Sequence, residues 1–374
     1  MATLRMSQIV LAGLVVTLMA QSSPASAFEW ETASPESQGL SGATLAAMSH
    51  DLQGRGTTDL LIIRHDRIVH EWYAPDASRT ARHYTASLAK AIVGGTSLML
   101  AIDDGLIAPD DLACSYVAQW RDDPLKSRIT IRHLATHTSG IEDAEQDDLP
   151  HDQLPGWKSA FWKQEPNPFL TARDDAPVLF EPGTQSQYSN QGMAMLAYCV
   201  AAALRDAPQS DVRALLTERL MDPIGVPRSE WSMGYGRSFE LDGLTLYANW
   251  GGGSYSPNAV ARIGRLMLRR GDWDGQQLVR PEVVDLVTAD AGVPLEGATT
   301  GRRPGLCWWL NADGAVAGVP RDAFFGSGAG NQLLGVIPSL DLIVVRNGAQ
   351  ISPEGHWDGV EDYLLNPLMA AVVG

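Results

Sequence analysis

Residues 87–104 read SLAKAIVGGTSLMLAIDD, and Gly105 follows them. Ala, Leu, Ile and Met recur in this stretch at helical spacing, and a glycine directly after the last apolar turn is a usual helix end. The stretch therefore predicts one buried helix that begins at Ser87. Ser87 and Lys90 lie three positions apart, so the hydroxyl and the amine share a helix face within hydrogen-bonding reach.

This Ser–Lys pair has two interpretations. Ser at a helix start is ordinarily an N-cap, and Lys is ordinarily solvated. The chain, however, has 24 Arg and only four Lys, and Lys90 is the one Lys that follows a Ser by three positions. On an apolar helix a Lys is desolvated, which lowers its pKa toward that of a usable base, and Arg cannot do this. The setting favours a nucleophilic Ser87 assisted by Lys90.

Strand patterns occupy both ends of the chain. Residues 59–73 (DLLIIRHDRIVHEWY) hold two β-rich runs around a polar centre, which predicts a hairpin. Near the other end we predict strands over residues 305–311, 323–326, 331–337 and 340–346, and then a helix over 357–373. Between the two ends, helices are predicted over residues 130–136, 192–204, 211–220, 257–270 and 281–289.

This order of elements predicts an α+β fold. An antiparallel sheet would be built from both chain ends and flanked by helices, and a helical region, roughly residues 106–300, would be inserted between the strand-forming ends. The length of 374 residues, with 45% hydrophobic residues, allows a large buried core. We therefore expect one domain over residues 28–374.

The charge balance limits the possible partners. The formal net charge of -16 would repel nucleic-acid phosphates and anionic lipid headgroups, and no long basic run opposes it. We therefore expect no nucleic-acid partner.

The first 27 residues have the pattern of a cleaved secretory signal. Arg5 is their only charged residue, an apolar run covers residues 9–20, and residues 25–27 (ASA) form a small-residue cleavage site. A retained anchor is the alternative, but the apolar run is shorter than the roughly 20 residues that span a bilayer. We expect a periplasmic or secreted protein with no stable membrane span.

Export would place Cys114, Cys199 and Cys307 in an oxidising compartment, where two of them could pair. Their spacing matches no metal-ligand pattern, and buried free thiols are the favoured alternative. GxSxG, Walker, HExxH and CxxC motifs are all absent from the chain. We expect neither a metal ion nor an organic cofactor.

Two further segments could face a cleft. Tyr188-Ser189-Asn190 precedes the predicted apolar helix that starts at Gly192. Residues 326–330 (GSGAG) end one predicted strand and lead into the next, and such small residues let a backbone N–H approach a ligand closely. Taken alone, each segment also fits an ordinary turn.

Taken together, these segments resemble the motifs of the penicillin-recognising serine hydrolases. This family includes class C β-lactamases, serine DD-peptidases, family VIII esterases and 6-aminohexanoate-oligomer hydrolases, and it carries S-x-x-K, then Y-x-N, then K/H-T/S-G. The matching residues are Ser87 and Lys90, Tyr188 and Asn190, and Ser327 and Gly328. Residues 131–140 (IRHLATHTSG) and 250–253 (WGGG) look similar too. The resemblance covers nearly all of the chain after residue 27 and implies a β-lactamase/transpeptidase-like fold.

The resemblance also implies a function. The chain would be an exported serine hydrolase that cleaves a small-molecule ester or amide through an acyl-enzyme on Ser87, with Lys90 and Tyr188 as proton-transfer groups. The implied substrate-binding and oxyanion residues are Asn190, Ser327, Gly328 and Ala329, beside the backbone N–H of Ser87.

Gly326 departs from the family pattern, since Lys or His usually stands there and helps to hold a substrate carboxylate. Losing one partner of such a charge pair typically costs roughly 2–5 kcal/mol, so efficient β-lactamase activity is not expected. Two alternatives stay open: a class C-type β-lactamase or D-amino-acid peptidase, and a sensor or binding protein without turnover. The sequence specifies no oligomeric partner.

The histidines and acidic residues of the middle region receive structural interpretations. Capping and hydrogen bonding explain His133 and His137, so we build no Ser-His-Asp triad from them. The acidic cluster is most simply a solvated loop; its members are Glu142, Asp143, Glu145, Asp147 and Asp148.

Overall fold

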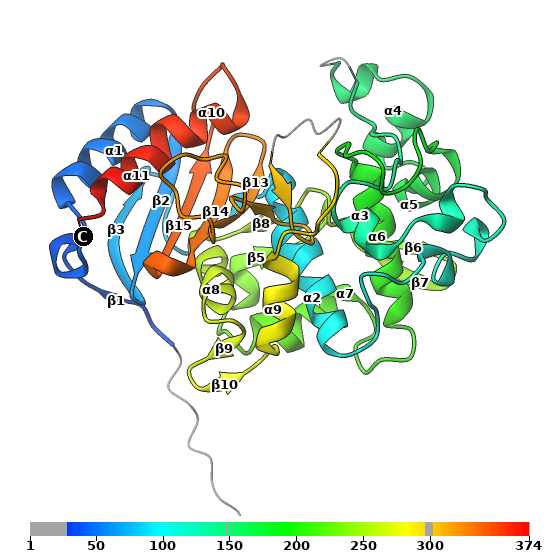
Figure 1. The fold of residues 1–374 in the computed structure, drawn as a ribbon, viewed down its shortest axis with the longest axis horizontal. Coiled ribbons are helices and arrows are strands. Elements are labelled where there is room, and N and C mark those ends of the chain that lie inside the picture. The colour runs from blue at the N-terminus through cyan, green and yellow to red at the C-terminus, as the bar shows by residue number, and fades with distance from the viewer. Residues whose placement is uncertain (1–27, 147–148, 296–301, 374) are drawn as a thin grey trace, which may run out of the picture.

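The computed structural model of the chain describes residues 28–146, 149–295 and 302–373. The predicted export signal, residues 1–27, lies outside the described residues, as do Asp147 and Asp148 of the acidic cluster. Figure 1 shows a sheet with its helices on one side of the molecule and a mainly helical region on the other.

Within the described residues the main sheet has eight strands, in the order β1-β3-β2-β15-β14-β13-β12-β11. Their bounds are β1 Glu31–Thr32, β2 Thr57–Arg64, β3 Arg67–Tyr73, β11 Arg303–Pro304, β12 Trp309–Leu310, β13 Phe324–Gly328, β14 Gln332–Ile337 and β15 Leu342–Gly348. β2 pairs antiparallel with β15, and Ile62 lies opposite Val344. The predicted sheet built from both chain ends is confirmed, with β1 and β3 as a parallel pair at its edge.

The predicted hairpin forms as β2 and β3. His65 and Asp66 make its turn with φ angles of 52° and 59°, the left-handed conformation that a two-residue type I′ turn requires. Side chains of β2 alternate between the sheet faces, so Leu60 belongs to one hydrophobic cluster and Leu61 to the other. Both faces of the sheet are therefore buried.

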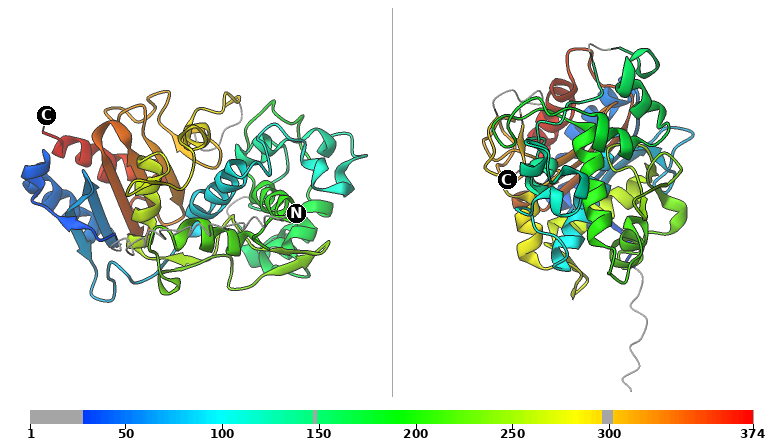
Figure 2. Two further views of the ribbon diagram at one scale, coloured as in Figure 1. Left: turned by 90° about the horizontal axis from the view of Figure 1, so that it is seen from below. Right: turned by 90° about the vertical axis from the view of Figure 1, so that its right-hand side faces the viewer.

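Helices cover both faces, and the left view of Figure 2 shows the sheet between them. On one face lie α1 (Gly42–Gly54), α10 (His356–Val360) and α11 (Asn366–Ala371). On the other face α8 (Pro257–Leu268) packs so closely that a Cβ at Gly264 would lie 2.9 Å from Leu334 Cδ1. The predicted C-terminal helix is confirmed, whereas α1 was not predicted.

Of the helices predicted over residues 106–300, α8 packs against the sheet, and the others lie in the helical region together with two short helices that were not predicted, α4 and α5. Its helices are α3 Ile131–Ala135, α4 Gly156–Lys163, α5 Pro168–Leu170, α6 Asn190–Ala203, α7 Val212–Leu216 and α9 Pro281–Thr288. Short strands accompany them: β4 His83–Tyr84, β5 Trp231–Ser232, β6 Phe239–Leu241, β7 Leu244–Leu246, β8 Ser254–Tyr255, β9 Asp272–Trp273 and β10 Gln276–Gln277.

The strand predicted over residues 305–311 is wrong for most of that length, since β12 covers only Trp309–Leu310. Cys307 has a φ of 70°, which breaks an extended strand, and its N–H donates to the carbonyl of Ala135 in the helical region instead of to a sheet neighbour. The loop therefore connects the sheet to the helical region.

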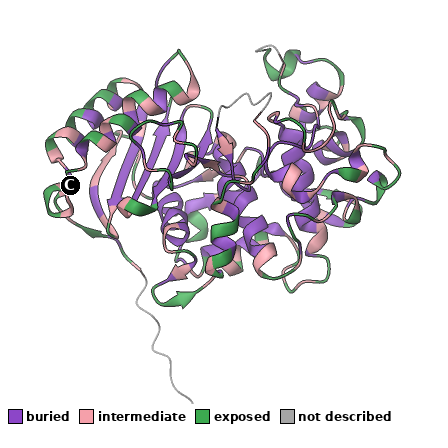
Figure 3. Cartoon of the chain, viewed as in Figure 1, coloured by how far each residue is buried: buried purple, intermediate pink, exposed green. Residues whose placement is uncertain are grey.

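The predicted buried helix forms in three segments: a 3₁₀ turn (Ala86–Leu88), a π-helical segment (Lys90–Gly95) and α2 (Thr96–Asp103). Figure 3 shows the centre of the molecule, where it lies, as mostly buried. Among the described residues, 86–103 is the one helical stretch long and apolar enough to cross a membrane, and 78% of it is buried inside the protein. Burial of this kind is typical of a core helix.

The cysteines are free thiols, as the favoured alternative predicted. Cys199 is buried on α6, whereas Cys114 and Cys307 are only partly buried.

Candidate active site

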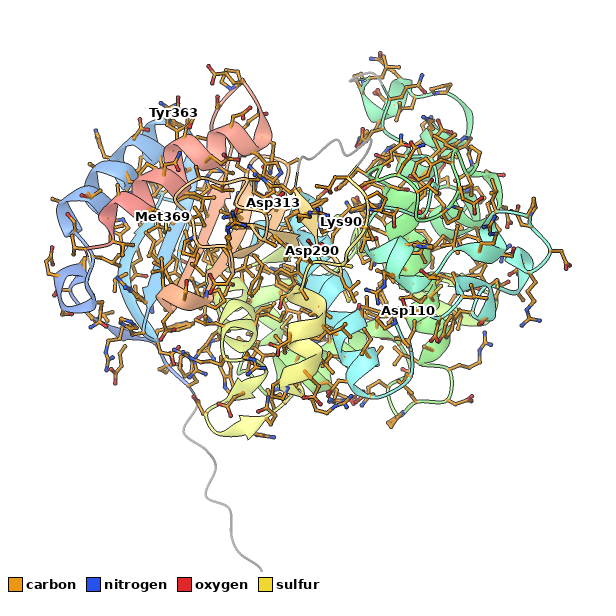
Figure 4. The ribbon with its side chains drawn as sticks, in the orientation of Figure 1. Lys90, Asp110, Asp290, Asp313, Tyr363 and Met369 are labelled. Carbon is orange, nitrogen blue, oxygen red and sulfur yellow. The ribbon has the colours of Figure 1, made fainter. Side chains whose placement is uncertain are left out.

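Ser87 and Lys90 lie on successive turns at the start of the core helix. Ala86 has a φ of 45°, so the chain enters the helix through a left-handed residue directly before Ser87. The Lys90 ammonium donates to Ser87 Oγ at 3.0 Å, the contact that the three-residue spacing predicts. Figure 4 shows Lys90 between the sheet and the helical region.

Lys90 is only 5% exposed, and three oxygens surround its amine. Besides Ser87 Oγ, its Nζ contacts Asn190 Oδ1 at 2.8 Å and the carbonyl oxygen of Trp250 at 2.6 Å. Burial lowers the pKa of Lys90 to about 7, although the nearby Asp143 carboxylate opposes this shift. A neutral Lys90 would still donate to the two carbonyl oxygens, and its lone pair would then face Ser87.

Asp143 corrects the prediction of a solvated acidic loop, because it is only 9% exposed. Its Oδ1 accepts hydrogen bonds from the backbone N–H and the side-chain Nδ2 of Asn190, at 2.9 and 3.0 Å, and from the N–H of Ala144. The Asn190 amide is thereby oriented with its oxygen toward Lys90. No local signal in the sequence separates Asp143 from its acidic neighbours.

Tyr188 completes the contacts of Ser87. Its hydroxyl donates to Ser87 Oγ at 2.8 Å, and its ring centroid lies 4.7 Å from Lys90 Nζ. Burial raises the pKa of Tyr188 above its usual value, so the phenol is protonated at neutral pH. Residues from the first two predicted motifs, 101 positions apart, thus meet around one hydroxyl.

His137 packs between the rings of Tyr188 and Trp309, with centroid distances of 4.6 and 5.7 Å. Its Nδ1 accepts the N–H of Ser189 at 3.2 Å. Burial, together with the charge of Lys90, lowers the pKa of His137 to about 3, so the ring is neutral. His133 forms a reciprocal capping box with Thr130. The structural interpretations of both histidines are confirmed.

The third predicted motif lies on β13, directly beside Ser87. A Cβ at Gly328 would lie 2.9 Å from the backbone nitrogen of Ser87, so this glycine is needed for the close approach. At Gly326 a Cβ would lie 2.7 Å from Leu88 Cδ1, so this position faces the core helix. Ser327 Oγ lies 2.6 Å from Nε2 of His356, 29 residues further along the chain, and no local sequence pattern predicts this contact.

Two adjoining cavities open next to Ser87. One, of about 630 Å³, is lined by Asp143, Glu145, Gln187, Tyr188, Trp309, Ser327, Gly328, Ala329, His356 and Trp357. The other, of about 360 Å³, is mainly apolar and includes Tyr84, Trp162, Tyr235 and Trp250 in its lining. Within the described residues, no group of three or more His, Cys, Asp and Glu side chains could hold a metal ion. The arrangement is suited to acyl transfer with an apolar acyl or leaving group.

The fold and this site define a serine hydrolase, and comparisons with known proteins agree. The Beta-lactamase family matches residues 30–349. The chain belongs to this family.

Relatives of several activities share the fold. The 6-aminohexanoate-dimer hydrolase of Paenarthrobacter ureafaciens is 24% identical over 342 residues, which cover 86% of this chain and 80% of the relative. A penicillin-binding protein homologue from Caulobacter crescentus superposes with a TM-score of 0.61 at 15% identity, over 88% of this chain and 99% of its own. For a family VIII carboxylesterase the TM-score is 0.65 at 14% identity, over 91% and 99% of the two chains. At these identities the structural likeness establishes the fold, while the choice of substrate rests on the site.

Proposed function

We propose that this protein is an exported hydrolase of small-molecule esters or amides that acts through an acyl-enzyme on Ser87. One observation carries the proposal: Ser87 Oγ lies 3.0 Å from the buried amine of Lys90 and 2.8 Å from the hydroxyl of Tyr188. A nucleophile, a base with a pKa of about 7 and a neutral proton donor are therefore in mutual contact.

In the acylation step, neutral Lys90 takes the proton of Ser87 while Oγ bonds to the substrate carbonyl carbon. The carbonyl oxygen becomes an oxyanion, which the backbone N–H groups of Ser87 and of the Gly328–Ala329 segment stabilise. As the bond to the leaving group breaks, the leaving oxygen or nitrogen receives the proton of Tyr188, which is restored from Lys90.

Deacylation repeats these transfers with water as the nucleophile. Water gives a proton to neutral Lys90, directly or through the Tyr188 hydroxyl, as the water oxygen bonds to the acyl carbon. The ester bond to Ser87 then breaks, Ser87 Oγ takes the proton back from Lys90, and the carboxylic acid leaves. Asn190 holds Lys90 throughout, and Ser327 contributes to substrate binding.

Steady-state hydrolysis of a short-chain p-nitrophenyl ester tests the proposal. Ser87→Ala should abolish turnover, and the matched change at an exposed serine, Ser229→Ala, should leave it intact. A Ser87→Ala variant that retains full turnover would remove Ser87 as the nucleophile. The 6-aminohexanoate dimer is the amide to try next, because a relative of this chain is named for it.

The alternatives make different predictions in the same assay. A β-lactamase would turn over a chromogenic cephalosporin, and a D-amino-acid peptidase would cleave a D-Ala-D-Ala peptide. Gly326 carries no cation for the carboxylate of either substrate, which favours the esterase or amidase. A sensor would give a stable adduct mass on Ser87 without steady-state product.

Export is tested on protein expressed from the full-length gene in a Gram-negative host. We expect it in the periplasm or medium with Phe28 as its first residue, because residues 25–27 form the cleavage site. An N-terminal sequence that still includes residues 1–27 would contradict cleavage.

A further inference from the structure

Ser327, on the strand beside the nucleophile, is part of a hydrogen-bonded chain of side chains that runs into the fold. Its Oγ lies 2.6 Å from Nε2 of His356, the first residue of α10. On the other side of the ring, Nδ1 of His356 lies 3.3 Å from Nδ2 of Asn331. The three side chains resemble a Ser-His-Asn catalytic triad in outline, so the direction of each hydrogen bond decides what they can do.

The orientation of the Asn331 amide sets that direction. Its Oδ1 accepts the N–H of Ile351 at 2.8 Å, and its Nδ2 donates to the carbonyl oxygen of His356 at 2.6 Å. A flipped amide would place two oxygens against each other at this second contact. The nitrogen of Asn331 therefore faces Nδ1 of His356, which must accept, so the ring proton is on Nε2.

A proton on Nε2 makes His356 the donor to Ser327. A catalytic triad needs the opposite arrangement, in which Nδ1 carries the proton and Nε2 takes the proton of the serine, so this geometry rules out Ser327 as a second nucleophile. Ser327 Oγ accepts the hydrogen bond from Nε2–H of His356, so the hydroxyl proton of Ser327 can be donated to another acceptor. Among the described residues, no protein group accepts the hydroxyl proton of Ser327. Ser327 lines the cavity next to Ser87, so a bound substrate could accept it.

The surroundings keep the ring neutral. His356 is half-buried, and the guanidinium of Arg346 on β15 lies nearby, so partial burial and this positive charge lower the pKa of His356. Arg346 itself is fully buried and donates to the carbonyl oxygens of Gly330 and Asn331, which fixes the turn that carries Asn331. The carboxylates that line the same cavity, Asp143 and Glu145, come from the helical region on its other side.

We infer that His356 is a positioning residue that holds Ser327 as a hydrogen-bond donor to an uncharged oxygen of the bound substrate. The inference rests on the proposed hydrolase function. In this arrangement β13 offers the substrate a neutral hydrogen-bond donor, the Ser327 hydroxyl, and Gly326 supplies no cation. This side of the cleft therefore suits substrates whose acyl and leaving groups are uncharged.

The test compares kcat and KM for p-nitrophenyl butyrate in four variants whose folding is checked by circular dichroism. His356→Leu removes the donor to Ser327 and should raise KM about three- to tenfold, with kcat within about twofold of wild type. His356→Gln keeps a donor and an acceptor on the side chain and should restore KM. Ser327→Ala should match His356→Leu, and the double variant should be no worse than Ser327→Ala alone.

Two results would overturn the inference. One is a wild-type KM in His356→Leu, and the other is multiplication of the two single effects in the double variant, because either result means that His356 does not act through Ser327.

A second measurement does not depend on activity. Nitrogen-15 NMR of the imidazole in the free protein should show the proton on Nε2, and a proton on Nδ1 would overturn the inference even if no ester is hydrolysed. Absence of wild-type turnover, by contrast, would contradict the proposed function and leave this tautomer result to decide the role of His356.

Discussion

At the scale of single residues, the activity of the site depends on the pKa of Lys90, which is set by the burial of its amine and by the carboxylate of Asp143. Burial lowers its pKa to about 7, and the Asp143 carboxylate, which also orients Asn190, raises it. Lys90 must be neutral to accept the proton of Ser87. Activity should therefore rise as the pH increases through about 7, and the protonated form should be inactive.

Asp143→Asn tests this electrostatic coupling. The amide oxygen of the variant side chain can still accept the three hydrogen bonds that Asp143 Oδ1 accepts, but the negative charge is gone. The ammonium form of Lys90 loses stabilisation, so its pKa falls, and the acid limb of kcat/KM plotted against pH should move to lower pH.

The matched control is Glu142→Gln. Glu142 precedes Asp143 in the chain but forms an ion pair with Lys158 at 2.8 Å. The pH dependence of kcat/KM in Glu142→Gln should coincide with that of wild type. An Asp143→Asn profile that stays in place or moves to higher pH would show that Asp143 does not stabilise charged Lys90.

The motifs predicted the residues at the centre of the site but not the residues that orient them through hydrogen bonds. Ser87 and Lys90 are close in sequence, so helix geometry alone brings them together. Asp143 and His356 are recruited by tertiary packing, and each belongs to a segment whose composition suggests a solvated surface. No local pattern distinguishes a carboxylate that is buried against Asn190 from one in a polar loop.

At the scale of elements, β13 must lie directly against the core helix for the cleft to form. A Cβ at Gly326 would lie 2.7 Å from Leu88 Cδ1 and 2.8 Å from the Cβ of Ala91. The same contacts leave no room for a larger side chain at this position unless the helix that carries Ser87 shifts.

Gly326→Ala should therefore destabilise the protein by about 1–3 kcal/mol, since the added methyl group overpacks a buried interface. Urea denaturation measures this change. Gly54→Ala is the control, because Gly54 at the end of α1 has no atom within 4 Å of an added Cβ. The control should be neutral or up to about 1 kcal/mol more stable. Equal stability of the two variants would contradict close packing at β13.

Element prediction succeeded where a long apolar pattern existed and failed where tertiary contacts decide. The hairpin and the core helix have strong periodicity and form as predicted. α1 was missed although Leu45, Met48 and Leu52 follow helical spacing and are buried. Residues 305–311 have a strand-like composition, but most of them form a loop, because the N–H of Cys307 donates to the carbonyl of Ala135 in the helical region.

At the scale of the whole molecule, the first and last segments that the structure describes are hydrogen-bonded to each other, and the sheet and the helical region share one core. The N–H of Ser41 donates to the carbonyl of Ala371 at 2.7 Å, and that of Val373 donates to Gly39 at 3.0 Å. A single hydrophobic cluster includes Leu61 and Val345 of the sheet and buried leucines of the helical region. The core helix belongs to the same cluster, so the helical insertion and the sheet stabilise each other.

This shared core predicts one cooperative unfolding transition for residues 28–374, despite the visible division into sheet and helical region. Far-ultraviolet circular dichroism, tryptophan fluorescence and residual activity should be lost together on heating. Leu98 is fully buried in the core helix, so Leu98→Ala should lower the midpoint temperature of this transition and reduce the free energy of unfolding by about 2–5 kcal/mol. The transition should remain a single step. Helical signal that persists after activity and fluorescence are lost would show that the helical region is a separate domain. Coincident loss would mean that the cleft, which lies where the two parts meet, exists only while both are folded.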